Sequence, residues 1–173
     1  MSAPLLAEVR RARTVDVAGI RALVDTFTAD RRLLMKATVT LYEDVQEFFV
    51  AVEVTGGVER VVGCGALHVL WEDLAEVRTL AVSPDAQGKG VGAALLTRLV
   101  ENARELGVRR LFCLTFETEF FGRHGFVTAE EALVDPDVQA ELLQSSDEGV
   151  AEFLDLERVK PNTLGNTRML ALL

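Results

Sequence analysis

Three glycines stand where a strand-like run of the sequence gives way to a helix-like run, and they have the clearest chemical potential in the chain. Gly88, Gly90 and Gly92 alternate with Lys89 and Val91 just as the apolar periodicity of a helix begins. Glycine leaves backbone N–H groups uncovered, and the first N–H groups of a helix have no partner inside it. Together with the positive end of the helix dipole and the charge of Lys89, these donors predict a phosphate-binding turn.

Three kinds of phosphate site could use such a turn. A Walker A loop requires Gly-x-x-x-x-Gly-Lys-Ser/Thr, which the segment does not contain. A dinucleotide-binding fold requires G-x-G-x-x-G early in the fold, whereas the spacing here is G-x-G-x-G and two antiparallel strands are expected before it. The third kind is a turn that binds the pyrophosphate of coenzyme A.

The elements that must position this turn alternate between strands and helices. The predicted strands are 9–13, 47–54, 60–71, 75–82, 108–115 and 166–173. The predicted helices are 16–27, 40–45, 91–106, 119–124 and 136–143. Thr55-Gly56-Gly57 predicts a hairpin, and strand, helix, strand around the glycine turn predicts a right-handed parallel crossover. The order favours a mixed α/β (α+β) fold with an antiparallel front half and a βαβ centre.

Length and composition exclude several classes of protein. The 173 residues suit a single domain, and 18 basic against 27 acidic side chains give a net charge of −9, the wrong sign for a general nucleic-acid binder. The longest uncharged apolar stretch, 61–71, is too short to span a membrane, which takes about 20 residues. Segment 1–13 has the wrong charge order for a signal peptide, so we expect a cytoplasmic protein.

The histidines and cysteines lack the spacing of a zinc site, and we expect no metal. Cys64 and Cys113 lie in apolar, strand-like runs, which predicts buried reduced thiols. The conspicuous aromatic side chains are expected in the core; these are Phe48, Phe49, Trp71 and Phe112.

Charge is unevenly distributed along the chain. Segment 127–157 has ten acids and no Lys or Arg, and we interpret it as a solvated helix face or a surface that could form a homodimer. Segment 8–36 has seven bases against four acids. An anionic small ligand could therefore find a basic pocket that involves the N-terminal third.

The glycine turn and its surroundings resemble the GNAT acetyltransferase superfamily. The signature Gln/Arg-x-x-Gly-x-Gly/Ala is matched by Gln87, Gly90 and Gly92, after a strand that ends in Ala-Val-Ser-Pro at 81–84 and before Phe-Phe-Gly-Arg-His-Gly-Phe at 120–126. The likeness covers about 9–127 and implies a GNAT fold with acetyl-CoA as co-substrate. The residues that it implies for cofactor binding are Leu80, Ala81, Val82, Gln87, Gly88, Lys89, Gly90, Val91, Gly92, Ala93 and Phe121.

A closer resemblance, spanning nearly the whole chain, is to the short actinobacterial-type amino-acid N-acetyltransferases, which are N-acetylglutamate synthases. It is carried by segments 61–71, 75–82, 111–121 and 159–169. It implies one domain over 1–173, with an acidic insert at about 127–157 and a tail at about 158–173 that closes the substrate site. It also implies transfer of acetyl to the α-amine of L-glutamate, or of L-glutamine, by direct attack without an acyl-enzyme, as the first step of arginine biosynthesis.

The same resemblance suggests roles for individual residues. Glu76 falls where the synthases keep a glutamate and is the candidate proton acceptor. Backbone N–H groups around Leu80 to Val82 would stabilise the oxyanion. Phe121 stands where many GNAT enzymes have a tyrosine that protonates the leaving thiolate, so the general acid is unassigned. Thr115 aligns with a hydroxyl residue of the synthases. The candidates for binding the acceptor amino acid are Lys36, Asn166, Thr167 and Arg168, with Lys160 and Arg78 as weaker ones.

Other functions are compatible with the same motifs. A GNAT enzyme could acetylate a protein N-terminus or a small-molecule amine, and a non-catalytic GNAT domain could bind acetyl-CoA as a sensor. The choice between glutamate and glutamine, the oligomeric state and inhibition by arginine stay open at this stage.

Overall fold

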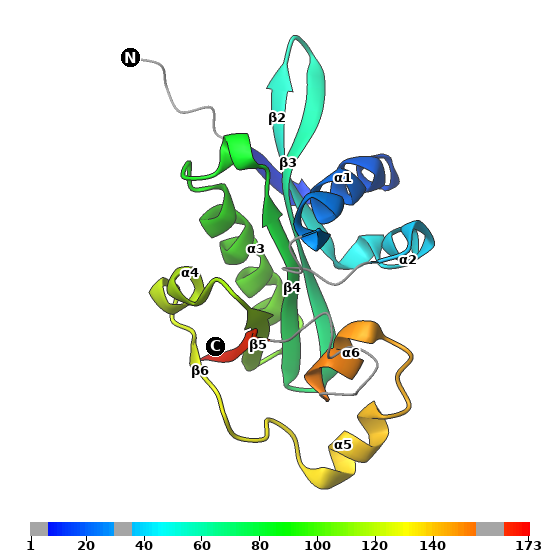
Figure 1. Ribbon diagram of the computed structural model, residues 1–173, viewed down its shortest axis with the longest axis vertical. Coiled ribbons are helices and arrows are strands. Elements are labelled where there is room, and N and C mark those ends of the chain that lie inside the picture. The colour runs from blue at the N-terminus through cyan, green and yellow to red at the C-terminus, as the bar shows by residue number, and fades with distance from the viewer. Residues whose placement is uncertain (1–6, 30–35, 155–164) are drawn as a thin grey trace.

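The fold is built on one mixed sheet (Figure 1), in a computed structural model that describes residues 7–29, 36–154 and 165–173. Its strands follow the order β1-β2-β3-β4-β5-β7-β6. The strands are β1 (Glu8–Arg11), β2 (Phe48–Thr55), β3 (Val58–Trp71), β4 (Leu74–Val82), β5 (Arg110–Thr115), β6 (Val127–Thr128) and β7 (Thr167–Leu172). The α-helices are α1 (Val17–Thr28), α2 (Thr38–Glu43), α3 (Val91–Glu105), α4 (Thr118–Arg123), α5 (Pro136–Leu142) and α6 (Glu148–Phe153).

The predicted antiparallel front half and parallel centre are both present. β1 to β4 pair antiparallel in chain order, and Gly56 and Gly57 turn the β2–β3 hairpin. β4 and β5 pair in parallel, with α3 as the crossover between them. The chain therefore has the α/β architecture that the order of its elements predicts.

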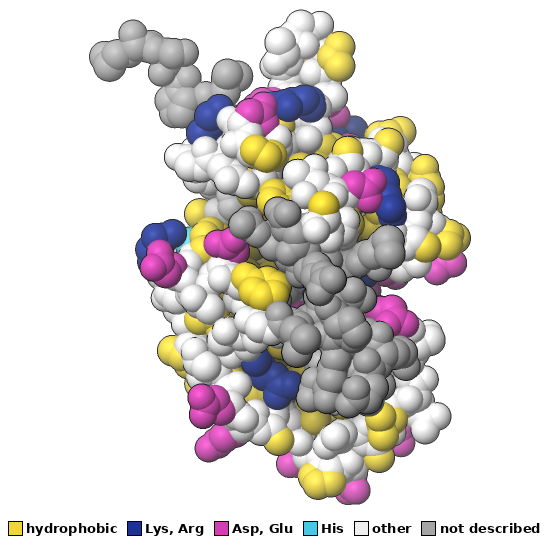
Figure 2. All heavy atoms as spheres, in the orientation of Figure 1, with side chains coloured by type: hydrophobic (Ala, Val, Ile, Leu, Met, Phe, Trp, Pro, Cys, Tyr) yellow, Lys and Arg dark blue, Asp and Glu magenta, His cyan; other side chains and the backbone are white. Residues whose placement is uncertain are grey.

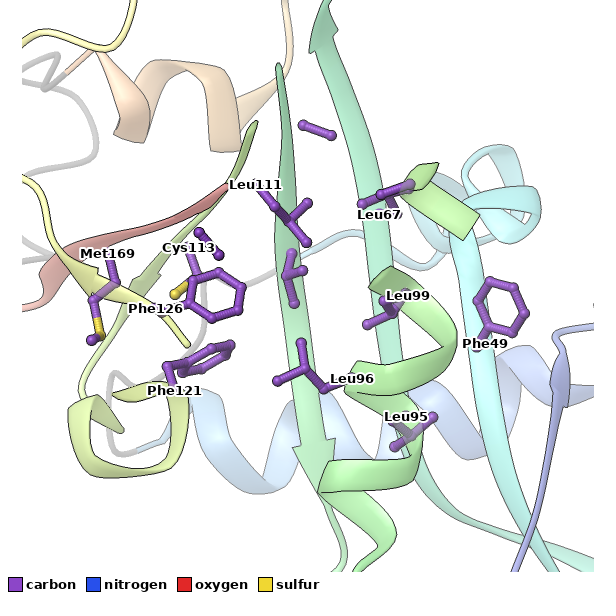
Figure 3. Close-up of a cluster of buried hydrophobic side chains, with 14 of the residues drawn as sticks. Phe49, Leu67, Leu95, Leu96, Leu99, Leu111, Cys113, Phe121, Phe126 and Met169 are labelled. Carbon is purple, nitrogen blue, oxygen red and sulfur yellow. The ribbon is translucent and has the colours of Figure 1, made fainter. Parts of the chain in front are cut away.

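Helices cover both faces of the sheet (Figure 1). Leu95, Leu96 and Leu99 of α3 pack on one face, in a cluster that reaches Cys113 and Phe121 (Figure 3). The apolar stripe of α1 packs on the opposite face with α2. A third cluster joins Leu74 of β4 and Phe112 of β5 to α5 and α6.

The acidic segment behaves differently in its two halves. Most of α5 is exposed, as a solvated helix face should be, and carboxylates are scattered over the lower part of the molecule in Figure 2. α6 was not predicted from the sequence, and its residues Gly149, Val150, Ala151 and Phe153 are buried. The expectation of a wholly solvated acidic insert was therefore wrong for α6.

Smaller expectations have mixed outcomes. Cys64 and Cys113 are buried free cysteines, and Phe48, Phe49 and Phe112 are buried as predicted. Trp71 was expected in the core, but it ends β3 and is 39% exposed. The last predicted strand is β7, whereas the two-residue β6 had no clear sequence signal.

An opening between β4 and β5 positions the site. The two strands pair only from Leu74 to Glu76 on β4 and from Arg110 to Phe112 on β5. Beyond that point β5 continues alongside β7, while β4 continues alongside β3. The backbone of β4 is irregular here, because Thr79 has a φ of 55° and the β3–β4 register shifts between Cys64 and Ala66. The gap thus begins at Glu76.

None of the helices among the described residues is long and apolar enough to cross a membrane.

Candidate functional site

The glycine turn lies at the far end of this gap and opens α3. Gly88 and Gly90 have φ values of 75° and 82°, which side chains rarely adopt, and Gly90 directly precedes the helix. The side-chain amide of Gln87 donates a 3.1 Å hydrogen bond to the carbonyl of Val82, so it fastens the turn to the end of β4. The first N–H groups of α3 are therefore presented toward the gap, as a phosphate site requires.

A cavity of about 530 Å³ runs from this turn into the gap between β4 and β5. Most of the residues predicted to bind the cofactor line it, namely Leu80, Ala81, Val82, Gln87, Gly88, Gly90, Val91, Gly92, Ala93 and Phe121. Lys89 is exposed and is not part of this lining. A ligand with a phosphate-bearing end and an apolar arm suits a cavity with this lining.

Glu76 lies where the two strands part, and it is only 4% exposed. Its Oε2 accepts a 3.1 Å hydrogen bond from Nε of Arg78, which is on the same strand and is also buried. Burial raises the pKa of Glu76, although the charge of Arg78 opposes the shift. Val77 and Arg78, which follow Glu76 on β4, line the cavity, and a carboxyl group with a raised pKa beside a cavity is suited to accepting a proton.

Arg78 also connects β4 to the acidic segment. Its Nη1 lies 2.9 Å from Oδ1 of Asp147, whose Oδ1 caps α6 by accepting a hydrogen bond from the N–H of Val150. Burial acts to raise the pKa of Asp147, but the hydrogen bond and charge of Arg78 prevail and lower it to about 2. The guanidinium therefore lies between two carboxylates.

Another carboxylate of α6 lies at the same site. Oε1 of Glu152 accepts a 2.6 Å hydrogen bond from the side-chain amide of Asn166. Burial and the nearby charge of Glu76 raise the pKa of Glu152 to about 7, with Arg78 and Lys36 acting in the other direction. The acceptor side of the gap thus combines several carboxylates with at least two cations.

Comparison with known proteins agrees with this geometry. The model of the acetyltransferase (GNAT) family matches residues 20–126. This chain belongs to the GNAT acetyltransferase family. The predicted GNAT resemblance and the acetyltransferase class are thereby confirmed.

A sequence match and a structure match from Mycobacterium tuberculosis each cover almost the whole length of this GNAT protein. The amino-acid acetyltransferase of Mycobacterium tuberculosis is 58% identical over 165 residues, which are 95% of this chain and 94% of that protein. The crystal structure of Rv2747 from Mycobacterium tuberculosis, in complex with CoA and NLQ, matches with a TM-score of 0.90 at 58% identity, over 96% of this chain and 99% of that one.

A larger structural relative is similar over one part of its length. The N-acetylglutamate synthase of Neisseria gonorrhoeae, complexed with coenzyme A and N-acetyl-glutamate, has a TM-score of 0.74 and 26% identity. The match takes in 100% of this chain but 36% of the synthase. The GNAT chain therefore corresponds to about a third of that protein.

The residues predicted to bind the amino acid do not all reach the site in the same way. Lys36 is half-buried, and its charge acts on the carboxyl groups of both Glu76 and Glu152. The guanidinium of Arg168 lies over the ring of Phe153 and donates a 2.7 Å hydrogen bond to the carbonyl of that residue, so it helps to hold α6. Lys160 lies outside the described residues.

Thr167 and Thr115 face each other in the β5–β7 register, and Thr115 lines the cavity. The hydroxyl oxygen of Thr115 accepts a 2.8 Å hydrogen bond from the N–H of Glu117. Phe121 is buried and packs edge-on against Phe120 and Phe126. It thus forms part of the cavity wall.

Sequence reasoning missed three residues of α6 and its cap: Asp147, Gly149 and Glu152. Their segment is strongly acidic, which suggested a solvated surface. The one available signal was the spacing of Val150 and Phe153, three residues apart behind a capping aspartate. Among the described residues, no group of three or more His, Cys, Asp or Glu side chains could hold a metal ion.

Proposed function

We propose that this protein transfers the acetyl group of acetyl-CoA to the α-amine of a free amino acid, with L-glutamate or L-glutamine as the acceptor. The observation that carries the proposal is the cavity that runs from the glycine turn to Arg78, whose guanidinium holds the buried carboxyl of Glu76. The relatives named above support it, because one is an amino-acid acetyltransferase and another is an N-acetylglutamate synthase bound to its product. Such an activity fits the first step of arginine biosynthesis.

Acetyl-CoA would enter with its phosphates at the glycine turn. The N–H groups at Gly88, Gly90 and the start of α3 can hold the pyrophosphate, and the apolar walls of the cavity suit the pantetheine arm. The thioester would then lie in the gap near Leu80 to Val82. A backbone N–H in this irregular stretch of β4 is the proposed donor to the oxyanion.

Direct attack by the amine is the proposed chemistry. Cys113 lines the cavity, but burial raises the pKa of its thiol well above the usual range, and the thiol is a poor nucleophile while it stays protonated. This argues against an acyl-cysteine intermediate. The amine nitrogen attacks the carbonyl carbon, the C–S bond breaks, and CoA leaves as a thiolate whose conjugate thiol has a pKa near 8.5. Solvent or Thr115 can then supply its proton.

The two ends of the acceptor need different partners. Glu76 would bind the amine and accept a proton from it. Lys36, Lys160, Thr167 and Arg168 remain the proposed contacts to the carboxylate or amide groups of the acceptor, whereas the side-chain amide of Asn166 is already engaged by Glu152. Arg168 already contacts Phe153, so we assign its main effect to holding the segment that closes the acceptor side.

Thiol release from acetyl-CoA, screened against the twenty amino acids, tests the proposal. We expect turnover with glutamate or glutamine, and a large loss of kcat in Glu76→Gln with the affinity for CoA retained. Tight binding of acetyl-CoA without turnover on any amino acid would instead indicate a sensor or an enzyme for another amine.

A further inference from the structure

One face of α6 lies directly against Arg78. A Cβ atom added to Gly149 would come within 2.7 Å of Cζ and 2.8 Å of Nη2 of Arg78, so any larger residue here requires the guanidinium or the helix to move. Residues three apart on a helix share a face. Glu152 therefore lies one turn further along the face of α6 that touches Arg78, and Arg78 is the residue that holds Glu76.

The side-chain amide of Asn166, just before β7, also holds Glu152. Asn166 directly precedes Thr167, which pairs with Thr115 across β5 and β7. Thr115 in turn lines the cofactor cavity. The carboxylate of Glu152 is thus bracketed between Arg78 on β4 and Asn166 beside β5, across the opening between those two strands.

The proposed reaction removes two protons from the acceptor nitrogen in each turnover. The acceptor enters as an ammonium ion with three N–H bonds, and the amide product keeps one. Two protons must therefore leave the nitrogen in every turnover, the first before attack and the second as the tetrahedral adduct collapses. Glu76 can take one of them, and the other goes to a second acceptor, which can be the departing thiolate, solvent or another carboxylate beside the acceptor.

We propose that Glu152 takes the first proton from the acceptor's ammonium and that Glu76 takes the second. This rests on the proposed acetyl transfer. In the first step an N–H bond breaks, an O–H bond forms on Glu152, and the neutral amine gains its lone pair. The nitrogen then forms the C–N bond, loses its second proton to Glu76, and the C–S bond breaks with the electron pair leaving on the CoA thiolate. Both carboxyl groups afterwards return their protons to solvent or to the thiolate.

The surroundings of Glu152 suit this role. Burial and Glu76 raise the pKa of Glu152 to about 7, while the hydrogen bond from Asn166 and the charges of Arg78 and Lys36 act to lower it. Glu76 and Arg78 are on β4, Lys36 precedes α2, and Asn166 precedes β7. A base with a pKa near the working pH accepts a proton from an ammonium ion and releases it again with little bias.

The test is the pH dependence of kcat/KM for L-glutamine and L-glutamate between pH 5.5 and 9, in wild type and three variants. Glu152→Gln keeps the shape of the side chain and removes the base. Asn166→Ala keeps the base and removes its hydrogen bond. Glu148→Gln is the matched control, because Glu148 is an exposed acid on the same helix. The affinity for CoA, measured by calorimetry, reports on the cofactor half of the site.

We expect Glu152→Gln to lose about 100-fold or more in kcat/KM, together with the limb of the profile near pH 7, and to bind CoA as wild type does. Asn166→Ala should keep most of the activity with that limb moved to higher pH, and Glu148→Gln should match wild type. A wild-type profile in Glu152→Gln would overturn the role of Glu152. An equal loss in Asn166→Ala with no shift would also overturn it, because Glu152 would then only anchor the chain.

The activity of wild-type protein distinguishes a failure of the proposed function from a failure of the role of Glu152. If wild-type protein turns over no amino acid, acetyl transfer to amino acids and the role of Glu152 both fall. If wild type is active and Glu152→Gln is equally active, the acetyltransferase activity stands and only the second base is lost.

Discussion

Arg78 and Glu76 face the same side of β4, and Nε of Arg78 donates a 3.1 Å hydrogen bond to Oε2 of Glu76. The pair lies where β4 separates from β5, and the guanidinium fixes one oxygen of the carboxylate there. Its positive charge also restrains the rise in pKa that burial imposes on Glu76. Arg78 is therefore a positioning residue for the proposed base.

Replacing Arg78 with glutamine should move the acidic limb of the activity profile to higher pH. Without the guanidinium the pKa of Glu76 rises further, and each unit of rise costs about tenfold in the ionised fraction below the pKa. We expect kcat/KM at pH 7 to fall by about tenfold or more and to recover in part at pH 9. Arg98→Gln is the control, since Arg98 pairs with Glu101 on the exposed face of α3. An Arg78→Gln profile that overlays wild type would contradict the role.

A single methyl group tests the contact between α6 and β4. Gly149→Ala would place a Cβ 2.7 Å from Cζ of Arg78, so the helix or the guanidinium must shift. Alanine favours a helix over glycine by up to about 1 kcal/mol, yet we expect overpacking to prevail and the free energy of unfolding to fall by about 1–3 kcal/mol. The KM for the amino acid should rise more than the KM for acetyl-CoA.

Gly122→Ala in α4 provides the comparison for this effect. A Cβ at Gly122 meets nothing within 4 Å, so the helix propensity of alanine acts alone and stability should rise by about 0.5–1 kcal/mol. Urea unfolding of both variants measures whether the free energy of unfolding falls in Gly149→Ala and rises in Gly122→Ala. A stabilised Gly149→Ala would show that α6 does not depend on its close approach to Arg78.

The sequence was enough to predict what depends on local pattern. The turn signal Thr55-Gly56-Gly57 between two apolar runs predicted the β2–β3 hairpin, and glycines before a periodic helix predicted the turn at α3. Glu76 and Lys36 followed from a resemblance to known synthases. What failed was long-range: Asp147 and Arg78 are 69 residues apart, and nothing local to α6 shows that its glycine meets a guanidinium on β4.

The contacts of Arg168 illustrate the same limit. An arginine in the tail was a reasonable candidate for binding a substrate carboxylate, because a guanidinium can hold a carboxylate with two hydrogen bonds. The structure shows it over Phe153, in a cluster that forms only when α6 packs on the sheet. Residue type predicted the chemistry that Arg168 can perform, but the partner depended on the tertiary fold.

The left-handed backbone at Gly90 should matter for the cofactor and not only for stability. Gly90→Ala forces a side chain into a φ of 82°, at a cost of about 1–2 kcal/mol, and displaces the N–H groups that open α3. Gly107→Ala, at the other end of α3 with a φ of 87°, carries the same strain away from the cavity. We expect both variants to lose similar stability, and Gly90→Ala alone to bind CoA at least about tenfold more weakly by calorimetry. Equal CoA affinities would remove the turn from the cofactor site.

Two acids at the same helix should give opposite pH dependences of stability. The pKa of Glu152 is raised from 4.5 to about 7 in the folded protein, which therefore binds more protons than the unfolded chain between those values. Stability should fall as the pH rises from about 4.5 to 7, and Glu152→Gln should remove this decline. The pKa of Asp147 is lowered from 3.8 to about 2, so its contribution is present above pH 3.8 and disappears as the pH falls toward 2.

Urea unfolding at a series of pH values separates the two effects. The stability of Glu152→Gln relative to wild type should grow from pH 4.5 to 7 and then level off. Asp147→Asn should be less stable than wild type above pH 4, because it leaves Arg78 with a buried charge that is only partly compensated, and the deficit should shrink toward pH 2. A stability difference for Glu152→Gln that does not change between pH 4.5 and 7 would mean that this carboxyl titrates as it does in water, and the second base would then have no reason to work near neutral pH.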